Sequence, residues 1–486
     1  MTSAFRKIAI ALVLVLLVAA AVGAWLLQGN PTDRPLAATV GKDPQLVDPE
    51  PEKFPTIGIA APVGWANGAA PVAAGGLVVN RFAQGLDHPR TMLTLPNGDV
   101  IVAETNRPGS GDGGGITGFV MKLLFRKAGA DTPSANKLIL LRDANVDGVA
   151  EQRFVLRAQS LDSPSGLAWQ KDTLYVANHN AVLSFAFTPG QTSLAGNPRK
   201  LMDLPGGGNH WMRNLELSPD GTKLYVAVGS ASNIAENGIE QEAGRAAIWE
   251  LDLASGKARQ FANGLRNPNG MDFNPATGEL WTVVNERDML GGDLVPDYLT
   301  NVPIGAQYGW PWVYWKTNED DRVKAPMPQF LTEYARKPEY ALGAHVAALG
   351  LRFAAAGNKL GDNLRNGAFI ARHGSWNRKP AVGYDVVFVT FDPNGNPRGS
   401  PTPVLTGFLR PDGKTNGRPT WLAFDRTGGL LVSDDTAGII WRVIAPGSAA
   451  NPGVKPVVTE SMPPQRQLNS EAEAIASFRP NPDDGQ

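Results

Sequence analysis

The chain has 486 residues and a formal net charge of -1, which excludes a nucleic-acid binder that relies on overall positive charge. It has no cysteine, which excludes disulfides, Cys-ligated zinc, iron–sulfur clusters and a thiol nucleophile. The 54 glycines and 39 prolines predict frequent turns and few long helices.

An apolar segment opens the chain. Arg6 and Lys7 precede an uninterrupted apolar run over residues 8–27, close to the roughly 20 residues that cross a bilayer as a helix. We interpret residues 1–30 as an N-terminal signal anchor, since the basic flank favours the cytoplasmic side. A cleavable signal peptide is the alternative. Both interpretations place the remainder on the periplasmic side of the inner membrane, anchored through the helix or released.

The central part of the chain, residues 76–445, repeats one pattern. Each copy is a short apolar strand, a polar turn such as Pro-Asn-Gly, and a second strand rich in Leu, Val and Tyr. The six copies cover residues 91–103, 166–177, 214–227, 270–283, 349–371 and 421–433. A hairpin repeated in this way is typical of β-propeller blades, so we predict an all-β, six-bladed β-propeller. A β-sandwich is the alternative, but it would not repeat a whole unit six times. Residues 31–75 read as a linker or strap and residues 446–486 as a tail.

Propellers bind ligands at one mouth of the central channel, so residues just before the inner strands are the first candidates. His210 follows three glycines and directly precedes the third copy, where a neutral imidazole can act as a general base. His88 and His345 precede the first and fifth copies, and His179 and His373 follow outer elements. For each of them, a histidine satisfied by turn backbone is the competing interpretation.

Arginines recur at the same places in the repeat. Four of them precede or begin inner strands: Arg90, Arg213, Arg266 and Arg418. Converging on one mouth they would repel each other unless an anionic ligand or acidic neighbours compensated them. Guanidinium groups suit carboxylates, so we expect a small polycarboxylate, with rim salt bridges as the alternative for each arginine.

Two loops could hold a cation. Asp143, Asn145 and Asp147, followed by Gly148 and Glu151, place oxygen atoms at alternating positions as in the first half of a calcium loop. The next residues read as strand, so a plain Asp/Asn-Gly hairpin turn is the alternative. The Gly-rich segment 109–115 lacks the Lys-Ser/Thr of a phosphate-binding loop and reads as a flexible loop.

Several motifs, in order, resemble a known family. They are Gly-Asn-His (208–210), Gly-Leu-Arg-Asn-Pro-Asn-Gly (264–270), Asn-Glu-Arg-Asp (285–288), Tyr-Gly-Trp-Pro (308–311), His-Gly-Ser-Trp-Asn-Arg (373–378) and Ser-Asp-Asp-Thr-Ala-Gly (433–438). The chain resembles the pyrroloquinoline quinone (PQQ)-dependent sugar dehydrogenases, which include the soluble aldose and glucose dehydrogenases. It is more similar to their sorbosone dehydrogenase-like branch. The resemblance covers roughly residues 75–445.

The resemblance implies a six-bladed propeller that binds PQQ, a tricarboxylic ortho-quinone, together with Ca²⁺. Carried over, His210 is the base and Arg266 polarises the reacting quinone oxygen. The residues implied to hold the cofactor are Asn267, Asn269, Arg213, Arg378 and Arg418. The backbone carbonyls of Arg287 and Asp288 are implied to hold its Ca²⁺, whereas Asp143, Asn145 and Asp147 would form a separate structural site. The family has an Asp beside the base, and this chain has Ser230 at that position.

The implied function is a quinoprotein that oxidises a sugar, a sugar-derived aldehyde or a related alcohol. The chain has no haem motif, so the electrons must leave to an external acceptor. The other partners are the small-molecule substrate and the membrane, and no nucleic acid is expected. Two alternatives are a Ca²⁺-dependent six-bladed propeller lactonase and a propeller that serves as a non-catalytic binding module.

Overall fold

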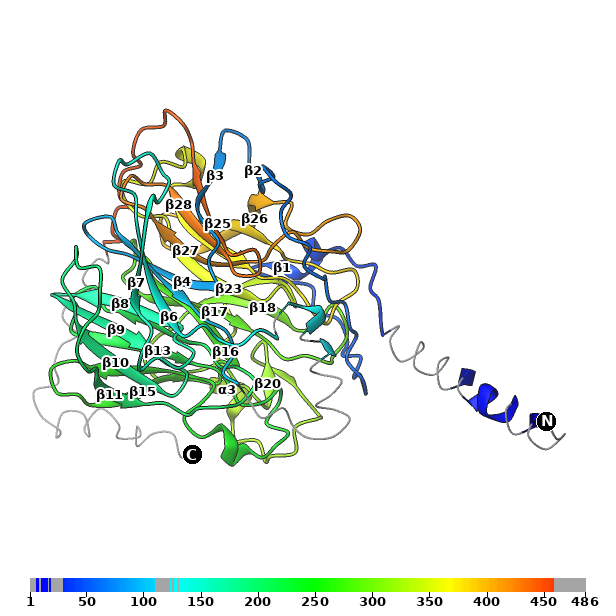
Figure 1. Ribbon diagram of the computed structural model, residues 1–486. Helices are drawn as coiled ribbons and strands as arrows, with labels where there is room; N and C mark the ends of the chain where they lie inside the picture. Colours follow the sequence, from blue (N-terminus) through cyan, green and yellow to red (C-terminus); the bar gives the residue numbers. More distant parts are fainter. Residues whose placement is uncertain are drawn as a thin grey trace, which may run out of the picture.

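The computed structural model describes residues 6–7, 10–15, 17–18, 29–109, 123–124, 126–129 and 131–458. Six sheets follow one another along the chain, antiparallel except for the short parallel pair of β15 and β19, and each is one blade of a β-propeller. The all-β, six-bladed prediction is therefore confirmed. In Figure 1 the strands of the first blade run from blue to cyan, and β27, β28 and β29 of the last blade are orange.

The blades share an order in which the first strand is innermost. Blade 1 contains β4 (Pro89–Thr94), β5 (Val100–Glu104), β6 (Lys137–Arg142) and β7 (Gln152–Arg157). Blade 2 contains β8 (Gly166–Gln170), β9 (Thr173–Ala177), β10 (Ala181–Ala186) and β11 (Arg199–Asp203). Blade 3 contains β12 (Arg213–Leu217), β13 (Lys223–Val228), β14 (Ala247–Asp252), β15 (Ala258–Asn263) and β19 (Ala306–Gln307).

The second half of the ring takes strands from both ends of the chain. Blade 4 contains β16 (Asn267–Phe273), β17 (Leu280–Asn285), β18 (Pro296–Asn301), β22 (Tyr340–Ala344) and β1 (Val40–Gly41). Blade 5 contains β23 (Ala348–Phe353), β24 (Gly367–Arg372), β25 (Asp385–Phe391), β26 (Pro397–Thr406) and β2 (Val72–Ala73). Blade 6 contains β27 (Pro419–Phe424), β28 (Leu430–Asp434), β29 (Ile439–Ile444) and β3 (Val78–Gln84).

The ring is closed by β3, which comes from the N-terminal side of the propeller and pairs antiparallel with β29, Gln84 opposite Ile439. Figure 1 shows the blue β3 beside the strands of the last blade. The seam between blades 6 and 1 is therefore covered by a strand of the last blade that leads directly into the first blade. Closure of this kind joins residues far apart in sequence, with β3 as the outermost strand of blade 6.

The short elements outside the sheets are few among the described residues. They are η1 (Leu36–Thr39), η2 (Ile239–Glu242), η3 (Asp362–Leu364), α3 (Leu331–Tyr334) and the hairpin of β20 (Val313–Tyr314) and β21 (Asn318–Glu319). The hairpin and α3 belong to a long insertion between β18 and β22.

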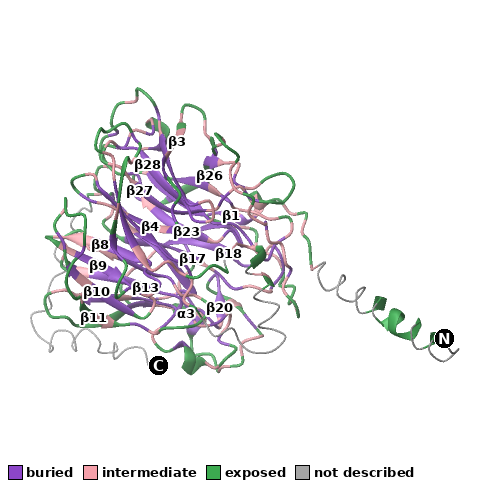
Figure 2. Cartoon of the chain, viewed as in Figure 1, coloured by how far each residue is buried: buried purple, intermediate pink, exposed green. Residues whose placement is uncertain are grey.

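The second strand of each blade is packed between two neighbouring strands and two neighbouring blades. In β5 all five residues are buried, and the same holds for β28. Runs rich in Val, Ile and Leu form such strands because both faces are covered. Figure 2 shows buried strands through the middle of the molecule and exposed loops around it.

Four of the six inner strands, β4, β16, β23 and β27, are bulged where they approach the site. The register shifts between Pro89 and Thr91, between Pro268 and Met271, between Ala348 and Gly350, and between Pro419 and Leu422. Bulges near a rim redirect side chains toward it. Gly270 also allows blades 4 and 5 to approach closely, because a Cβ there would lie 2.5 Å from the Leu351 backbone nitrogen.

The strap, residues 31–75, lies along the ring. Its strands β1 and β2 extend blades 4 and 5 at their outer edges. The predicted N-terminal helix, the Gly-rich segment and the tail lie largely outside the described residues. No helix in the described part of the chain is long and apolar enough to span a membrane.

Candidate active site

A polar cavity of about 230 Å³ lies at one mouth of the channel. Its walls come from the starts of inner strands, the ends of second strands and the loops that follow them. The lining residues are Arg90, His210, Arg266, Asn267, Asn285, Glu286, Asp288, Asp297, His345, Ala347, Leu349, His373, Gly374, Trp376, Asn377 and Arg418. Three histidines and three arginines therefore face one cavity, which we call the mouth cavity.

His210 enters the mouth cavity from the loop before β12. Its Nδ1 lies 2.9 Å from the Ser230 carbonyl oxygen and 3.0 Å from Ser230 Oγ. The Ser230 hydroxyl donates to the Ser232 carbonyl at 2.7 Å, so Oγ offers a lone pair to His210. Both contacts thus accept a proton from Nδ1. This fixes the tautomer with the hydrogen on Nδ1 and the basic lone pair on Nε2.

The imidazole of His210 is neutral at physiological pH. Burial lowers its pKa from 6.5 to about 3, helped by the positive charge of Arg266. Two acceptors on Nδ1, neither carrying a net charge, do not offset this effect. A neutral imidazole with its lone pair at a cavity is what a general base requires.

Arg266 is held rigidly at the cavity wall by Asp288 and by backbone. Its Nη2 contacts Asp288 Oδ2 at 3.0 Å and Asn233 Oδ1 at 2.9 Å, and its Nη1 donates to the Glu286 carbonyl at 2.6 Å. Burial would raise the pKa of Asp288, but Arg266, His345 and His210 together outweigh it and hold that pKa well below its usual range. Arg266 and Asp288 therefore form a charged pair on one side of the cavity.

A second charged group lies at the seam between blades 6 and 1, where Arg90 and His373 line the cavity and share the carboxylate of Asp435. Asp435 Oδ2 accepts from Arg90 Nη1 at 2.6 Å and from His373 Nε2 at 3.0 Å. Burial lowers the pKa of His373 to about 4, assisted by the charge of Arg418. Asp435 would be raised by burial, but His373, Arg90 and Arg418 hold its pKa far below the usual range. Arg90 thus has its own carboxylate.

Arg418 differs from the other two cavity arginines. Its Nε and Nη2 donate to the carbonyls of His373 and Gly374 at 3.2 and 3.0 Å. Its guanidinium also lies 5.5 Å from the ring centre of Tyr384. Within the described part of the chain, no carboxylate forms an ion pair with Arg418. It is therefore the cavity cation best placed to receive an anionic group.

Two further titratable groups close the wall between blades 4 and 5. Asp297 accepts from the backbone amides of Glu286 and Ala347 at 2.8 and 2.7 Å, and burial raises its pKa to about 7. Burial lowers the pKa of His345, but Asp288, the Gly291 carbonyl and Asp297 outweigh it, so the net shift is upward. His345 donates through Nε2 to the Gly291 carbonyl at 3.0 Å.

Five of the predicted site residues line the mouth cavity: His210, Arg266, Asn267, Asp288 and Arg418. Asn269 does not. It is buried beneath the wall, where its amide donates to the Asn267 carbonyl at 3.0 Å and to Asn285 Oδ1 at 3.3 Å. Its effect on a ligand is indirect, through the orientation of those two asparagines.

Arg213 and Arg378, which were predicted to hold the cofactor, lie outside the lining of the mouth cavity. Arg213 is fully buried and donates to the carbonyls of His210, Met212 and Pro205 at 2.7–2.9 Å, so it supports the loop of the base. Arg378 is also buried, with Asp293 as its ion pair at 2.9 Å. It donates to the carbonyls of Gly292 and Arg34, at 2.8 and 3.0 Å. Neither side chain reaches the mouth cavity, because backbone carbonyls of neighbouring loops take up their donors.

The predicted cofactor calcium loop is bound mainly by protein donors. The Asp288 carbonyl accepts from Asn233 Nδ2 and Arg322 Nη1, at 3.1 and 3.0 Å. The Arg287 side chain is buried between Glu286 and Asp320, and its own carbonyl accepts no hydrogen bond from the described residues. Of the two carbonyls, that of Arg287 is the one with no hydrogen-bond donor among the described residues.

The other predicted cation loop lies at the opposite rim. In blade 1, Glu104 at the end of β5 and Lys137 at the start of β6 lie opposite each other at the rim where β4 begins, the rim of the mouth cavity. Asp143 follows the other end of β6 and therefore lies at the opposite rim. The ligand oxygens of Asp143, Asp147 and Glu151 lie within 4.8 Å of one another, and this is the one such acidic or histidine group among the described residues. Asn145 donates to Asp147 at 3.0 Å. A structural calcium site here stays a prediction. The catalytic metal of the lactonase alternative would need a similar group of ligands at the mouth cavity, and the described residues form none there.

Sequence reasoning missed Asp297 and gave no role to Trp376 and Asn377. Asn377 donates to Asp288 Oδ1 at 2.7 Å, and Trp376 presents the one aromatic ring among the lining residues. Both belong to the motif 373–378, which could have identified them. His88 and His179 lie outside the cavity, where they contact Asp87 and Asp162 respectively.

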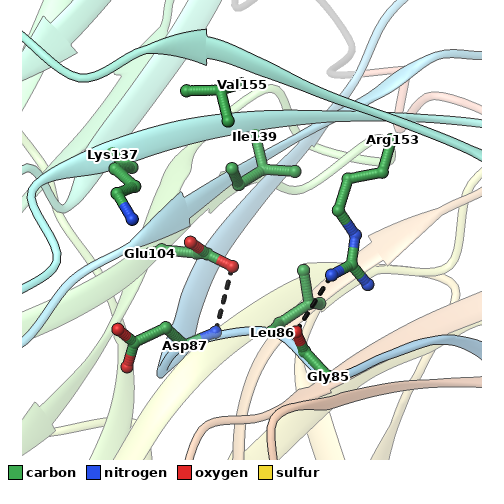
Figure 3. Close-up of a pocket in the computed structure, with 8 residues that line it drawn as sticks. All are labelled: Gly85, Leu86, Asp87, Glu104, Lys137, Ile139, Arg153 and Val155. Carbon is green, nitrogen blue, oxygen red and sulfur yellow. Dashed lines mark hydrogen bonds between the residues drawn. The ribbon is translucent and has the colours of Figure 1, made fainter.

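A second, larger cavity of about 410 Å³ lies between the end of β3 and blade 1. Figure 3 shows Glu104 accepting from the Asp87 amide and Arg153 donating to the Gly85 carbonyl. Its lining mixes two carboxylates, Lys137 and Arg153 with the apolar residues Leu86, Ile139 and Val155, of which only Val155 is exposed. The cavity shares no lining residue with the mouth cavity.

The mouth cavity fits a planar polycarboxylate. Arg418 has no carboxylate partner, and the buried Nε of Arg90 has no acceptor among the described residues. An anionic group would satisfy both. His210 adds an accepting nitrogen, and Trp376 is the one Trp, Tyr or Phe among the lining residues, so the residues present can hold an anionic ring system next to a base.

The comparisons with known proteins agree with this geometry. An uncharacterised protein of Borreliella burgdorferi is 32% identical over 238 residues, 48% of this chain and 60% of the relative. A PQQ-dependent pyranose dehydrogenase of Coprinopsis cinerea is 25% identical over 430 residues, 76% of this chain and 54% of the relative. The chain thus spans little more than half the length of these two curated relatives.

A solved structure shares the fold. The calcium structure of Trichoderma reesei Carbohydrate-Active Enzymes Family AA12 superposes with a TM-score of 0.62 at 22% identity, covering 77% of this chain and 96% of that one. The TrAA12-like family matches residues 132–303 and 321–445, more than half of the chain. The resemblance to the PQQ-dependent sugar dehydrogenases is confirmed, and the chain belongs to the TrAA12-like family.

Proposed function

We propose that the chain is a PQQ-dependent dehydrogenase that oxidises a sugar, a sugar-derived aldehyde or a related alcohol. The observation that carries the proposal is the state of His210. Its Nδ1 is engaged by Ser230, its pKa is lowered to about 3, and it shares a cavity with Arg266 and Arg418. A base facing cationic groups suits oxidation of a hydroxyl by an anionic quinone.

His210 Nε2 receives the hydroxyl proton of the substrate, and the Ser230 contacts keep the ring from turning as it becomes charged. PQQ, when bound, would supply the acceptor for the hydride from the substrate carbon that bears this hydroxyl. Arg266 places a fixed positive charge at the cavity wall, where negative charge develops during the transfer. Because Asp288 and backbone carbonyls hold this guanidinium before reaction, little reorganisation is needed.

The cofactor would be held by groups from blades 1, 4, 5 and 6. Arg418 and Arg90 suit its carboxylates, Asn267 offers an amide, and Trp376 covers a ring face. For the accompanying Ca²⁺ we propose the Arg287 carbonyl as a protein ligand, since it is the one of the two expected carbonyls with no hydrogen-bond donor among the described residues. The Trichoderma reesei protein described as a calcium structure supports the choice of metal.

Three finer points belong to the proposal. A sorbosone-type substrate follows from the motif at 373–378, which carries His373, Trp376 and Asn377 into the cavity. An external electron acceptor follows because the sequence has no haem motif. A location on the periplasmic side of the inner membrane follows from the apolar run at 8–27, and fractionation of cells that express the full chain tests it.

Reconstitution tests the proposal directly. Purified protein is titrated with PQQ in the presence of Ca²⁺, and reduction of a dye acceptor is then followed with aldoses and sugar aldehydes. We expect PQQ-dependent dye reduction that His210→Ala abolishes, whereas His179→Ala, a histidine outside the cavity, retains it. Lack of PQQ binding, or lactone hydrolysis without PQQ, would contradict the proposal.

A further inference from the structure

The strap contains a short segment that contacts the two loops on either side of Arg418 and the carboxylate of Asp434. We call residues 58–65 the clamp segment. We propose that its Trp65 is a positioning residue for Arg418, acting through the buried carboxylate of Asp434, so that the strap is part of the anion-binding site. This rests on the proposed function for the identity of the anion, but not for the positioning itself.

The clamp segment is bound to the loops that carry cavity residues by backbone hydrogen bonds. The Gly58 amide donates to the Trp376 carbonyl at 2.7 Å. Thr415, three residues before Arg418, donates to the Ala61 carbonyl at 2.9 Å and accepts from the Val63 amide at 2.8 Å. The segment therefore connects the loop after β24 to the loop before β27.

Trp65 completes the connection with its side chain. Its indole Nε1 donates to Asp434 Oδ2 at 2.8 Å, and its ring packs edge-on against Phe408 and Trp441. Asp434 Oδ1 in turn accepts from the backbone amide of Arg418 at 2.8 Å. One fully buried carboxylate thus links the strap to the residue that faces the anion.

Arg418 is consequently fixed at both ends by groups bound to the strap. Its backbone is held through Asp434 and Trp65. Its guanidinium donates to the carbonyls of His373 and Gly374, in the same loop whose Trp376 accepts from Gly58. An anion site needs its cation preset in this way, because ordering a long side chain on binding lowers affinity.

Asp434 receives neutral donors in place of a cation. Besides Trp65 and Arg418, the Trp441 indole and the Ala437 amide donate to it, at 3.2 Å each. The strap and β29 each contribute an indole donor, and the negative charge of the neighbouring Asp435 opposes ionisation of Asp434. Burial raises the pKa of Asp434 to about 6. A carboxylate held by so few compensating groups depends strongly on each donor.

Trp65→Phe tests the proposal, because it keeps an aromatic ring against Phe408 and Trp441 and removes only the N–H donor. Hydrogen exchange is measured in the cofactor-free protein, and PQQ affinity by titration. We expect faster exchange of the Arg418 amide and PQQ binding weakened about tenfold. Trp249→Phe is the matched control. It loses an indole hydrogen bond of 3.0 Å to Gly244 in blade 3 and should change neither measurement.

A double-mutant cycle shows whether Trp65 acts through Arg418. In an Arg418→Ala background, Trp65→Phe should weaken PQQ binding no further, because the group that it positions is gone. An equal second loss in that background, or unchanged exchange at Arg418, overturns the proposal. If the unaltered protein binds no PQQ, the proposed function fails and the exchange measurement alone decides the positioning.

A steric variant gives an independent check. A Cβ on Gly58 would lie 2.1 Å from the Arg378 carbonyl oxygen, so Gly58→Ala must displace the clamp segment. Gly75→Ala is its control, since no atom lies within 4 Å of the added carbon. We expect Gly58→Ala to raise exchange at Thr415 and Arg418 and Gly75→Ala to leave it unchanged. The same exchange in both variants would contradict the clamp.

Discussion

Replacing Ser230 by Ala separates the two groups that orient the base. The substitution removes Oγ at 3.0 Å from His210 Nδ1 but leaves the Ser230 carbonyl at 2.9 Å. A neutral hydrogen bond contributes about 0.5–1.5 kcal/mol net, so kcat/KM should fall about 2- to 12-fold. The Ser232 carbonyl also loses its donor, which should lower Tm by at most about 2–4 °C.

The assay is dye reduction by the PQQ-loaded variant at saturating acceptor, with kcat/KM followed over pH. The remaining carbonyl still fixes the tautomer, so the pH profile should keep its shape. A loss beyond about 100-fold, equivalent to about 2.7 kcal/mol, would show that Oγ and not the carbonyl orients His210. Removing the base itself, by contrast, should cost about 10²- to 10⁴-fold.

Three further predictions concern the same cavity. The acid limb of kcat/KM should lie near pH 3 and not near 6.5, because the pKa of His210 is lowered to about 3 and the neutral form is the base; a limb near 6.5 in a pH–rate profile would refute this. Between pH 6.5 and pH 3, His210 binds a proton in the unfolded chain but not in the folded protein. The contribution of His210 to the free energy of unfolding should therefore fall as pH falls through this range. Thermal unfolding of the unaltered protein and of His210→Gln over pH measures this difference. Arg418→Ala should weaken PQQ binding by about 10- to 100-fold by titration, whereas Arg213→Lys should mainly lower Tm because its donors bind backbone carbonyls; an equal loss of PQQ affinity in both would restore a cofactor role for Arg213.

The fold could be predicted from sequence because its signals are local. Each blade can be recognised from a turn such as 96–98 between two apolar strands, because turns with these residues are typical of β-hairpins. The position of His210 followed in the same way, since it directly precedes an inner strand. Closure by β3 could not be read, because pairing with β29 depends on a partner more than 350 residues away.

The arginines show where sequence reasoning failed. Arg213 precedes or begins an inner strand like its counterparts, but its guanidinium donates to the carbonyls of Pro205, His210 and Met212 and does not line the mouth cavity. The repeat gives the place of a residue along the chain, but not the acceptors that its side chain meets in the folded protein. Arg378 failed for another reason, since its acceptors at Gly292 and Arg34 come from segments that no local pattern connects.

The seam between blades 6 and 1 has a consequence for how the cofactor would affect the whole ring. Arg90 of blade 1 is paired with Asp435 of blade 6, and Ser433 donates to the Arg90 carbonyl at 2.9 Å, so the wall of the mouth cavity is also a joint of the closed ring. A ligand that bridges Arg90 and Arg418 would bind only the closed ring. By mass action, each tenfold excess of ligand over its Kd would then add about 1.4 kcal/mol against opening at this joint. The protein with bound ligand should therefore resist opening of the ring between blades 6 and 1 more strongly than the protein without it.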